Sequence, residues 1–179
     1  MTDSQPSVST TLNIEGLNAL PADEATAELL KCCGSRRWAG ELLKGRPYLS
    51  LEELSASADE VWWSLEPADW LEAFHSHPKI GETKAANSES AQAQQWSGQE
   101  QLGVRRGAPE TIEALARLNS EYETTFGYIF IVCATGKSSE EMLRILQERL
   151  ENDAAKELPV AAAEQAKITA LRLKKLLNT

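Results

Sequence analysis

The two histidines of the chain stand close together, in the segment Phe74-His-Ser-His-Pro-Lys-Ile-Gly-Glu82. Pro78 restricts the backbone of His77 to extended conformations, so the chain is expected to leave a helix and turn at this point. An imidazole at such a helix end can face a cavity, and it suits proton transfer because it titrates near neutrality. The alternative is a ring that only satisfies local hydrogen bonds, and this motif by itself favours that alternative.

A metal site is the other chemistry that a His-x-His pair suggests. However, His75 and His77 are the only histidines, and the three cysteines contain no Cys-x-x-Cys pair that would complete a ligand set. We therefore predict no metal site. Cys32, Cys33 and Cys133 are expected to be reduced, mostly buried thiols of an intracellular protein.

A second group of polar residues lies in the segment Trp96-Ser-Gly-Gln-Glu-Gln101. If this segment is helical, Ser97, Glu100 and Gln101 share one face, because they are three and four residues apart. The face then carries a hydroxyl, a carboxylate and an amide, which form a set of directional donors and acceptors. The alternative is a solvated polar face, which is favoured when the segment is considered alone.

Two arginines in the C-terminal part of the chain could each bind a negatively charged group. Arg172 lies off the main apolar stripe of its predicted helix, yet Ile168 and Leu176 stand one turn before and after it. Such an arginine either extends along apolar surface to water or reaches a partly buried anion. Arg149, with Asn152, lies near the end of another predicted helix, where an interaction with the helix dipole is favoured over ligand contact.

The elements that must position these residues are helical almost throughout. Ser50 is predicted to cap a helix that runs to about Leu65, and Pro67 to His75 forms another short helix. Further helices are predicted from near Ser88 to about Leu102, from Pro109 to about Tyr122, over 139–150 behind the capping box Ser138-x-x-Glu141, and over 159–177. The last helix is expected to bury a stripe formed by Ala162, Ala166, Ala170, Leu173 and Leu177.

One segment, 127–136, departs from this pattern because it is β-branched and aromatic between two glycines. The chain offers no second strand of similar quality, and a lone strand cannot satisfy its own backbone groups. We expect a helix end or a buried extended segment near 128–135, whose backbone finds partners elsewhere, a ligand among them. The prediction is a single compact all-α domain of about seven to nine helices over 13–179, after a disordered tail at 1–12.

The composition is that of an ordinary globular protein. With 179 residues the chain fits one domain with a real core, and it has 42% hydrophobic and 25% charged residues. The formal charge of −9 (18 − 27) argues against nucleic acid as a partner, although local arginines would still allow a small anionic substrate. We find no secretory signal, membrane-length apolar run or peroxisomal tail signal, and we predict a cytoplasmic location without membrane partners.

An ordered series of motifs extends from about residue 20 to residue 177. The motifs are Trp70-Leu-Glu-Ala-Phe-x-x-His77-Pro-Lys-Ile-Gly81, Trp96-Ser97-x-x-Glu100-Gln101, Asn119-x-x-Tyr122-x-x-x-Phe126-Gly127-x-Ile-Phe-Ile-Val-Cys-Ala134-x-Gly136, Glu148-Arg149-x-x-Asn152 and Glu164-Gln-x-x-Lys167-Ile-Thr-x-Leu-Arg172. In this order and spacing they resemble the 2-oxo-4-hydroxy-4-carboxy-5-ureidoimidazoline (OHCU) decarboxylase family, which acts last on the route from urate to allantoin. The chain looks most similar to the decarboxylase half of plant transthyretin-like allantoin synthase. Each motif alone is weak, but the ordered set is specific.

The resemblance implies an all-α homodimer that acts on a small ureide without a metal or organic cofactor. By motif, His77 and Glu100 would be the catalytic pair. The residues expected to line the substrate pocket are Pro78, Ser97, Gln101, Phe130, Ile131, Val132, Cys133, Ala134 and Arg172. His75 has no counterpart in the family pattern and is left out of the site.

The function expected from the resemblance is cofactor-independent decarboxylation of OHCU to (S)-allantoin in urate degradation. Two other classes of function stay open on the sequence. A catalytically inactive helical protein-interaction module would expose a large apolar groove and would hold no perturbed histidine. A ureide hydrolase would need a metal ion or an activated nucleophile.

Overall fold

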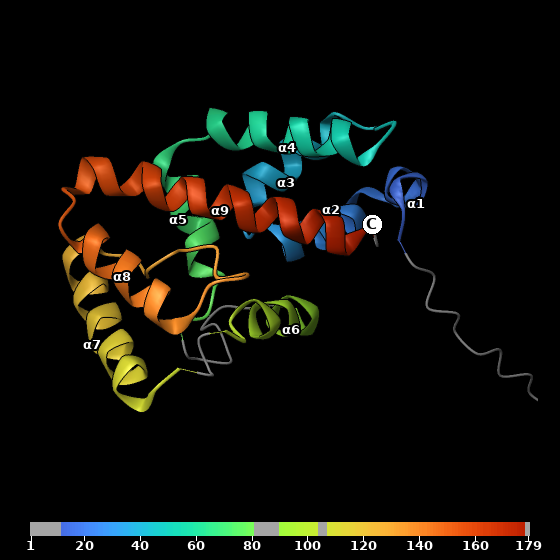
Figure 1. Ribbon diagram of the computed structural model, residues 1–179. Coiled ribbons are helices and arrows are strands. Elements are labelled where there is room, and N and C mark those ends of the chain that lie inside the picture. Colours follow the sequence, from blue (N-terminus) through green and yellow to red (C-terminus); the bar gives the residue numbers. More distant parts are fainter. Residues whose placement is uncertain (1–11, 81–89, 104–106, 178–179) are drawn as a thin grey trace, which may run out of the picture.

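The computed structural model describes residues 12–80, 90–103 and 107–177 (Figure 1). Within these ranges the chain forms nine helices and no strand, so the predicted all-α domain is confirmed. The tail predicted at 1–12 lies outside the described residues, apart from Leu12. None of the described helices is long and apolar enough to cross a membrane.

The helices vary from a little over one turn to more than six turns. In chain order they are α1 (Ile14–Ala19), α2 (Ala22–Cys32), α3 (Arg36–Lys44), α4 (Leu51–Ser64), α5 (Pro67–His75), α6 (Ala91–Glu100), α7 (Pro109–Phe126), α8 (Ser139–Leu150) and α9 (Ala154–Leu176).

Local signals in the sequence set several helix ends, and the starts of α4 and α8 are as predicted. The Ser50 side chain accepts a hydrogen bond from the N–H of Glu53 and so caps α4. At α8, Ser138 and Glu141 each accept a hydrogen bond from the other's backbone N–H, which completes the predicted capping box. Gly127 ends α7 at φ 80°, a left-handed conformation that favours glycine.

Three helix limits differ from the prediction. The helix α9 begins at Ala154, about one turn before the predicted start, because Asp153 caps it by accepting from the N–H of Lys156. Pro159 therefore lies inside the helix, where it is exposed and the carbonyl it leaves unpaired can be hydrated. The helix α7 runs on to Phe126 rather than ending near Tyr122. The helix α6 starts after its cap Ser90, and the predicted start at Ser88 lies outside the described residues.

The buried face of α9 also differs from the predicted alanine stripe. Ala170 is exposed, whereas Ala161, Gln165, Ile168 and Arg172 are buried. Ala162, Leu173 and Leu177 are buried as predicted, and the prediction was wrong at Ala170. Alanine is small enough to suit either face, while Gln165 and Arg172 find partners inside the protein. This rotation brings an amide and a guanidinium into the interior.

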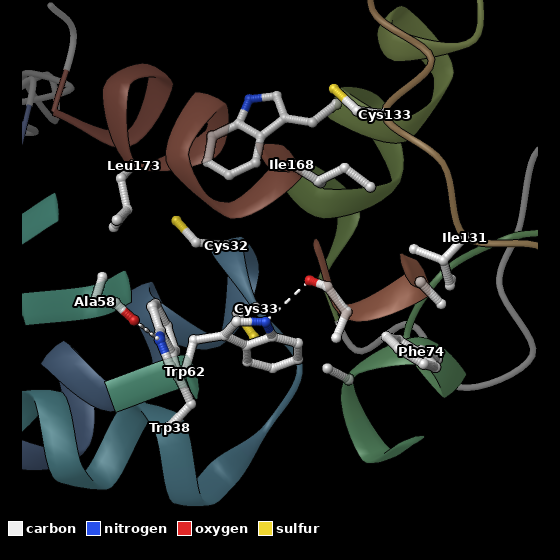
Figure 2. Packing of buried hydrophobic residues seen from close by; sticks show 14 of the residues in the cluster. Cys32, Cys33, Trp38, Ala58, Trp62, Phe74, Ile131, Cys133, Ile168 and Leu173 are labelled. Atoms are coloured by element: carbon white, nitrogen blue, oxygen red, sulfur yellow. Dashed lines mark hydrogen bonds between the residues drawn. The ribbon is translucent and has the colours of Figure 1, made fainter. Parts of the chain in front are cut away.

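The helix α9 is the central element of the domain. It contacts α2, α4 and α5, while α7 and α8 pack against each other near its N-terminal end (Figure 1). Buried tryptophans join the helices: the indole N–H of Trp62 in α4 donates to the carbonyl of Ala162 at 3.0 Å, and that of Trp38 donates to Ala58 at 3.0 Å (Figure 2). Each of these bonds satisfies a buried donor and so favours one packing of the helices.

All three cysteines are free and buried, as predicted. Burial raises the pKa of Cys33 to about 12 and raises that of Cys32 further. These two thiols therefore stay protonated and belong to the core.

The segment between α7 and α8 is buried from 130 to 134 and forms neither helix nor strand. Two of its backbone groups bind side chains from the neighbouring helices. The carbonyl of Ile131 accepts from Nη1 of Arg149 at 2.6 Å, and the N–H of Cys133 donates to Oε2 of Glu164 at 2.8 Å. The expected buried segment is thus confirmed, and at these two groups its partners are protein side chains.

Candidate active site

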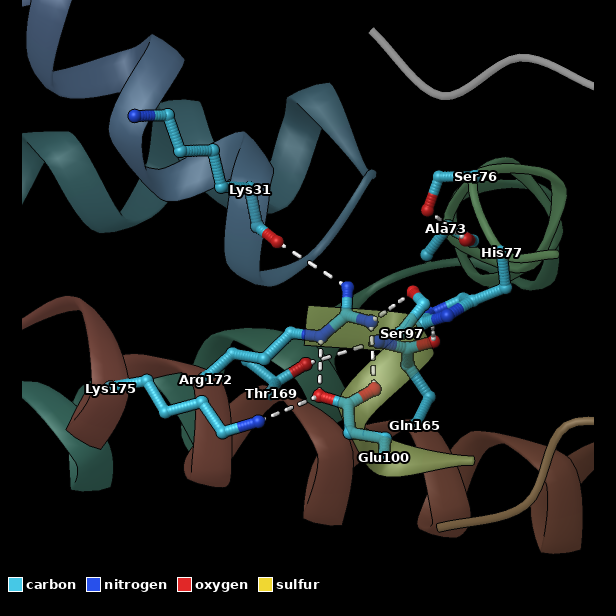
Figure 3. A network of polar contacts seen from close by, with 10 residues as sticks. All are labelled: Lys31, Ala73, Ser76, His77, Ser97, Glu100, Gln165, Thr169, Arg172 and Lys175. Carbon is cyan, nitrogen blue, oxygen red and sulfur yellow. Dashed lines mark hydrogen bonds and ion pairs between the residues drawn. The ribbon is translucent and has the colours of Figure 1, made fainter. Parts of the chain in front are cut away.

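His77 lies immediately after the C-terminal end of α5, where the following proline prevents the helix from continuing. Its backbone N–H donates to the carbonyl of Phe74 at 3.1 Å. The residue is partly buried, and Nε2 lies 2.7 Å from Oε1 of Gln165 in α9 (Figure 3). The end of one helix and the middle of another therefore fix this imidazole together.

The surroundings of His77 keep its ring neutral. Burial lowers its pKa to about 3, and the positive charge of Arg172 acts in the same direction. The negative charge of Glu100 and the hydrogen bond to Gln165 oppose this shift and do not overcome it. Near neutral pH, His77 is therefore an uncharged imidazole.

Glu100 and Arg172 form a buried ion pair between α6 and α9. Nε of Arg172 lies 3.1 Å from Oε1 of Glu100, and Nη2 lies 2.9 Å from Oε2 (Figure 3). Nη2 also donates to Oγ of Ser97 at 2.8 Å, and Lys175 approaches Oε1 at 3.5 Å. The anion partner that the position of Arg172 suggested is therefore Glu100.

Glu100 is held as a carboxylate. Burial alone would raise its pKa, but the hydrogen bonds and charge of Arg172, together with Lys175, hold the pKa below its ordinary value. An ionised carboxylate only accepts hydrogen bonds. Glu100 can therefore receive a hydroxyl or N–H group from a ligand but cannot donate to it.

A small cavity of about 30 Å³ joins these groups. It is lined by His77, Pro78, Ile80, Ser97, Glu100, Gln101, Phe130, Ile131, Val132, Ala134 and Ile168. The fold thus brings together every residue that was expected at the site except Cys133 and Arg172. Arg172 is not a lining residue but donates hydrogen bonds to Glu100 and Ser97, which are. Cys133 does not line the cavity either, and its N–H donates to Glu164.

Three residues beside the pair were missed in the sequence. Ile80 and Ile168 supply apolar walls, and Gln165 holds the ring of His77. Ile168 and Gln165 precede Arg172 by one and two helical turns, so a helical wheel aligned on Arg172 would have found them. No sequence signal relates Gln165 to His77, because 88 residues separate them.

A larger cavity, of about 990 Å³, lies beside Arg172 and contains neither His77 nor Glu100. Its charged side chains include Arg36, which pairs with Glu72 at 3.2 Å, and the exposed His75 also lines it. Size alone would favour this cavity. We assign the site to the smaller one because there a histidine, a carboxylate, a hydroxyl and an amide converge on one space.

A second buried network holds the wall of the small cavity. Arg149 binds Oε1 of the fully buried Glu157 through Nε at 2.6 Å, and Asn152 donates to Oε2 at 2.6 Å. Tyr122 donates to the same carboxylate, and Arg149 also donates to the carbonyl of Ile131. Arg149 was expected to serve the helix dipole. Its role is structural, but it acts through this buried carboxylate and the 130–134 segment.

Residues 18–174 match the family model of OHCU decarboxylase. The chain belongs to the OHCU decarboxylase family. The resemblance seen in the motifs is thereby confirmed.

The uric acid degradation bifunctional protein TTL of Arabidopsis thaliana is 38% identical over 148 residues, which cover 82% of this chain and 45% of that protein. The chain thus spans less than half of that relative. The 2-oxo-4-hydroxy-4-carboxy-5-ureidoimidazoline decarboxylase of Amia calva is 32% identical over 144 residues, covering 78% of this chain and 79% of that one.

Solved structures agree with this assignment. A crystal structure of OHCU decarboxylase in the presence of (S)-allantoin matches with a TM-score of 0.73 and 36% identity, over 85% of this chain and 98% of that one. A crystal structure of (S)-allantoin synthase matches with a TM-score of 0.70 over 94% of this chain and 55% of that one. Its identity of 18% supports the fold alone.

Proposed function

We propose that the chain catalyses the decarboxylation of OHCU to (S)-allantoin in urate degradation, without a cofactor. The observation that carries the proposal is that His77 and Glu100 line one cavity in a member of the OHCU decarboxylase family. The other polar groups at this cavity, Ser97, Gln101 and Arg172, suit a small ring rich in N–H and C=O groups.

The proposed reaction breaks the bond between a ring carbon and its carboxylate group. The carboxylate leaves as CO2, and the electron pair of the broken bond is delocalised into the adjacent carbonyl and C=N groups of the ring. The same carbon then takes up one proton, on one face. The substrate thus provides its own electron sink, and the protein has to hold the ring, orient the carboxylate and return the proton.

The roles follow from the charge state of each side chain. Glu100, as a carboxylate, accepts a hydrogen bond from the ring hydroxyl or a ring N–H. Ser97 and Gln101 fix the ring, and Arg172 binds ureido or ring oxygens. His77 stands beside the departing carboxylate and takes part in proton delivery, a contribution typically worth about 10²–10⁴-fold in rate.

Binding requires side chains at the cavity to move. A cavity of about 30 Å³ has room for a water molecule or two but not for a five-membered ring with its substituents. We infer that an anionic ligand competes with Glu100 for Arg172, which opens the ion pair and enlarges the space.

The two rival functions fit less well. A binding module gives no reason for a histidine whose pKa burial lowers to about 3 beside a buried carboxylate. A hydrolase that used Ser97 would need a general base on its hydroxyl. The group that donates to Ser97 is instead Arg172, which cannot take a proton.

The test is to add the protein to freshly made urate-oxidation intermediates and to follow CO2 release and circular dichroism. We expect optically active allantoin to appear faster than the racemic product of the spontaneous reaction. His77→Ala and Glu100→Ala should each lose this acceleration, and His75→Ala should keep it. Folded His77 and Glu100 variants that form optically pure product at the original rate would sink the assignment.

We also propose that the protein is a cytoplasmic homodimer, as the resemblance implies. Sedimentation equilibrium should give twice the chain mass of 19.7 kDa. The mass of a single chain throughout the micromolar range would contradict the dimer, but it would not bear on the proposed reaction.

A further inference from the structure

A buried chain of hydrogen bonds stands behind His77. Gln165 is completely buried in α9, and its side-chain amide has one neighbour on each side. Oε1 lies 2.7 Å from Nε2 of His77, and Nε2 of the amide lies 3.2 Å from Oγ1 of Thr169 (Figure 3). Thr169 in turn contacts the thiol of Cys33. The chain therefore runs from the candidate site into the core.

The direction of these bonds follows from counting donors and acceptors. The NH2 group of Gln165 can only donate, and it donates to the hydroxyl oxygen of Thr169 at 3.2 Å. The carbonyl oxygen of the amide is left to face His77, and two acceptors cannot bind each other. Nε2 of His77 must therefore carry a proton.

We propose that Gln165 is a positioning residue which holds His77 in the Nε2–H tautomer and so makes Nδ1 the atom through which the ring exchanges protons. Within the described parts of the chain no residue hydrogen-bonds Nδ1. Two charged groups act on the ring from the neighbouring helices, Glu100 from α6 and Arg172 from α9. Gln165 orients the ring without adding a third charge.

The inference rests on the proposed function where it concerns the reaction. Nδ1 of the neutral ring takes one proton from solvent when an anionic ligand lies beside it. After CO2 has left, Nδ1 passes this proton to the ring carbon, and the imidazole becomes neutral again. One proton is consumed for each CO2 released. Nε2 of His77 stays protonated and donates to Gln165 whether the ring is neutral or charged. The ring therefore keeps one orientation throughout the reaction.

The tautomer can be measured in the free protein by nuclear magnetic resonance of ring-¹⁵N-labelled histidine. A His75→Gln background leaves one histidine, so the spectrum reports His77 alone. We expect the Nε2–H tautomer in this background and a mixture of tautomers after Gln165→Leu. Asn119→Leu removes another buried amide, which bonds to Leu115 in α7, and should leave the tautomer unchanged. A predominant Nδ1–H tautomer, or no change in Gln165→Leu, would overturn the proposal.

Enzyme kinetics separate positioning from general damage. Gln165→Leu should lower kcat by about 10- to 10²-fold, part of what acid–base help contributes, with KM changed less than about threefold. Gln165→Glu keeps the shape of the side chain but adds a carboxylate beside Nε2, so the pH profile of kcat/KM should move to higher pH. An unmoved profile in this variant would contradict the proposal. If the parent protein fails to decarboxylate the substrate, the proposed function is wrong, and the tautomer experiment still decides the role of Gln165.

Discussion

At the residue scale, the ion pair of Arg172 and Glu100 combines a high desolvation cost with good geometry. The two side chains are 4% and 10% exposed, and they meet through two hydrogen bonds. Removing one member of such a pair leaves an uncompensated charge in the interior. The energetic importance of the pair therefore shows most clearly when only one partner is changed.

Arg172→Met should lower the free energy of unfolding by about 3 kcal/mol, because Lys175 at 3.5 Å compensates Glu100 only in part. The double variant Arg172→Met/Glu100→Gln should recover more than half of this loss, since neither charge is then buried. Urea unfolding of the parent protein, Arg172→Met, Glu100→Gln and the double variant measures the coupling free energy between the two side chains. Strictly additive effects would show that the two side chains do not interact in solution.

At the element scale, the 130–134 segment has no helical or sheet hydrogen bonds and depends on α8 and α9. Arg149→Met removes the donor to the carbonyl of Ile131 and leaves the carboxylate of Glu157 without its cation. We expect a loss of about 3–5 kcal/mol in unfolding free energy and a raised KM, because one wall of the cavity loosens.

The same helix supplies the control for this prediction. Arg144 is exposed and pairs with Glu148 one turn along at 2.7 Å, so Arg144→Met should cost less than about 0.5 kcal/mol and leave KM unchanged. Equal effects of the two substitutions on stability and KM would contradict the role given to Arg149.

A glycine at the end of α7 and a glycine inside α3 should respond in opposite ways to substitution by alanine. Gly127 has φ 80°, so Gly127→Ala should lower the free energy of unfolding by about 1 kcal/mol. Gly40 lies inside α3, where an added Cβ meets no atom within 4 Å, so Gly40→Ala should raise stability by up to about 1 kcal/mol. Thermal unfolding of both variants checks that the signs are opposite.

At the scale of the whole molecule, His77 couples stability to pH. Its pKa falls from an ordinary 6.5 to about 3 on folding, so between these values the unfolded chain binds more protons than the folded one. Acidification therefore lowers the free energy of unfolding, by about 1.2 kcal/mol from pH 6 to pH 5. Carboxylates such as Glu100, whose pKa is lowered on folding, add to the loss only at more acidic pH.

Urea unfolding measured at several pH values should show this slope in the parent protein and in His75→Gln. In His77→Gln the slope between pH 6 and 5 should be much smaller. A parent protein equally stable at both values would mean that the ring of His77 is open to water.

The sequence by itself determined the helices and the family, because their signals are local or ordered along the chain. Ser50 and the pair Ser138 and Glu141 act within one turn of backbone, so their effects can be predicted without knowing the fold. The expected site residues could be named because motifs keep their order. The start of α9 was predicted too late because proline usually occupies the first turn of a helix, whereas Pro159 lies inside α9.

Only the tertiary structure decided which polar groups meet. Gln165 reaches His77 across 88 residues, and Arg172 reaches Glu100 across 72. The rotation of α9 that buries both polar residues is set by its packing on α2, α4 and α5, which its own pattern of alanines does not specify. The charge states of the site depend on the same packing, because burial and neighbouring charges set a pKa. Sequence motifs named the candidate site residues, and the fold determined which of them meet and how each is charged.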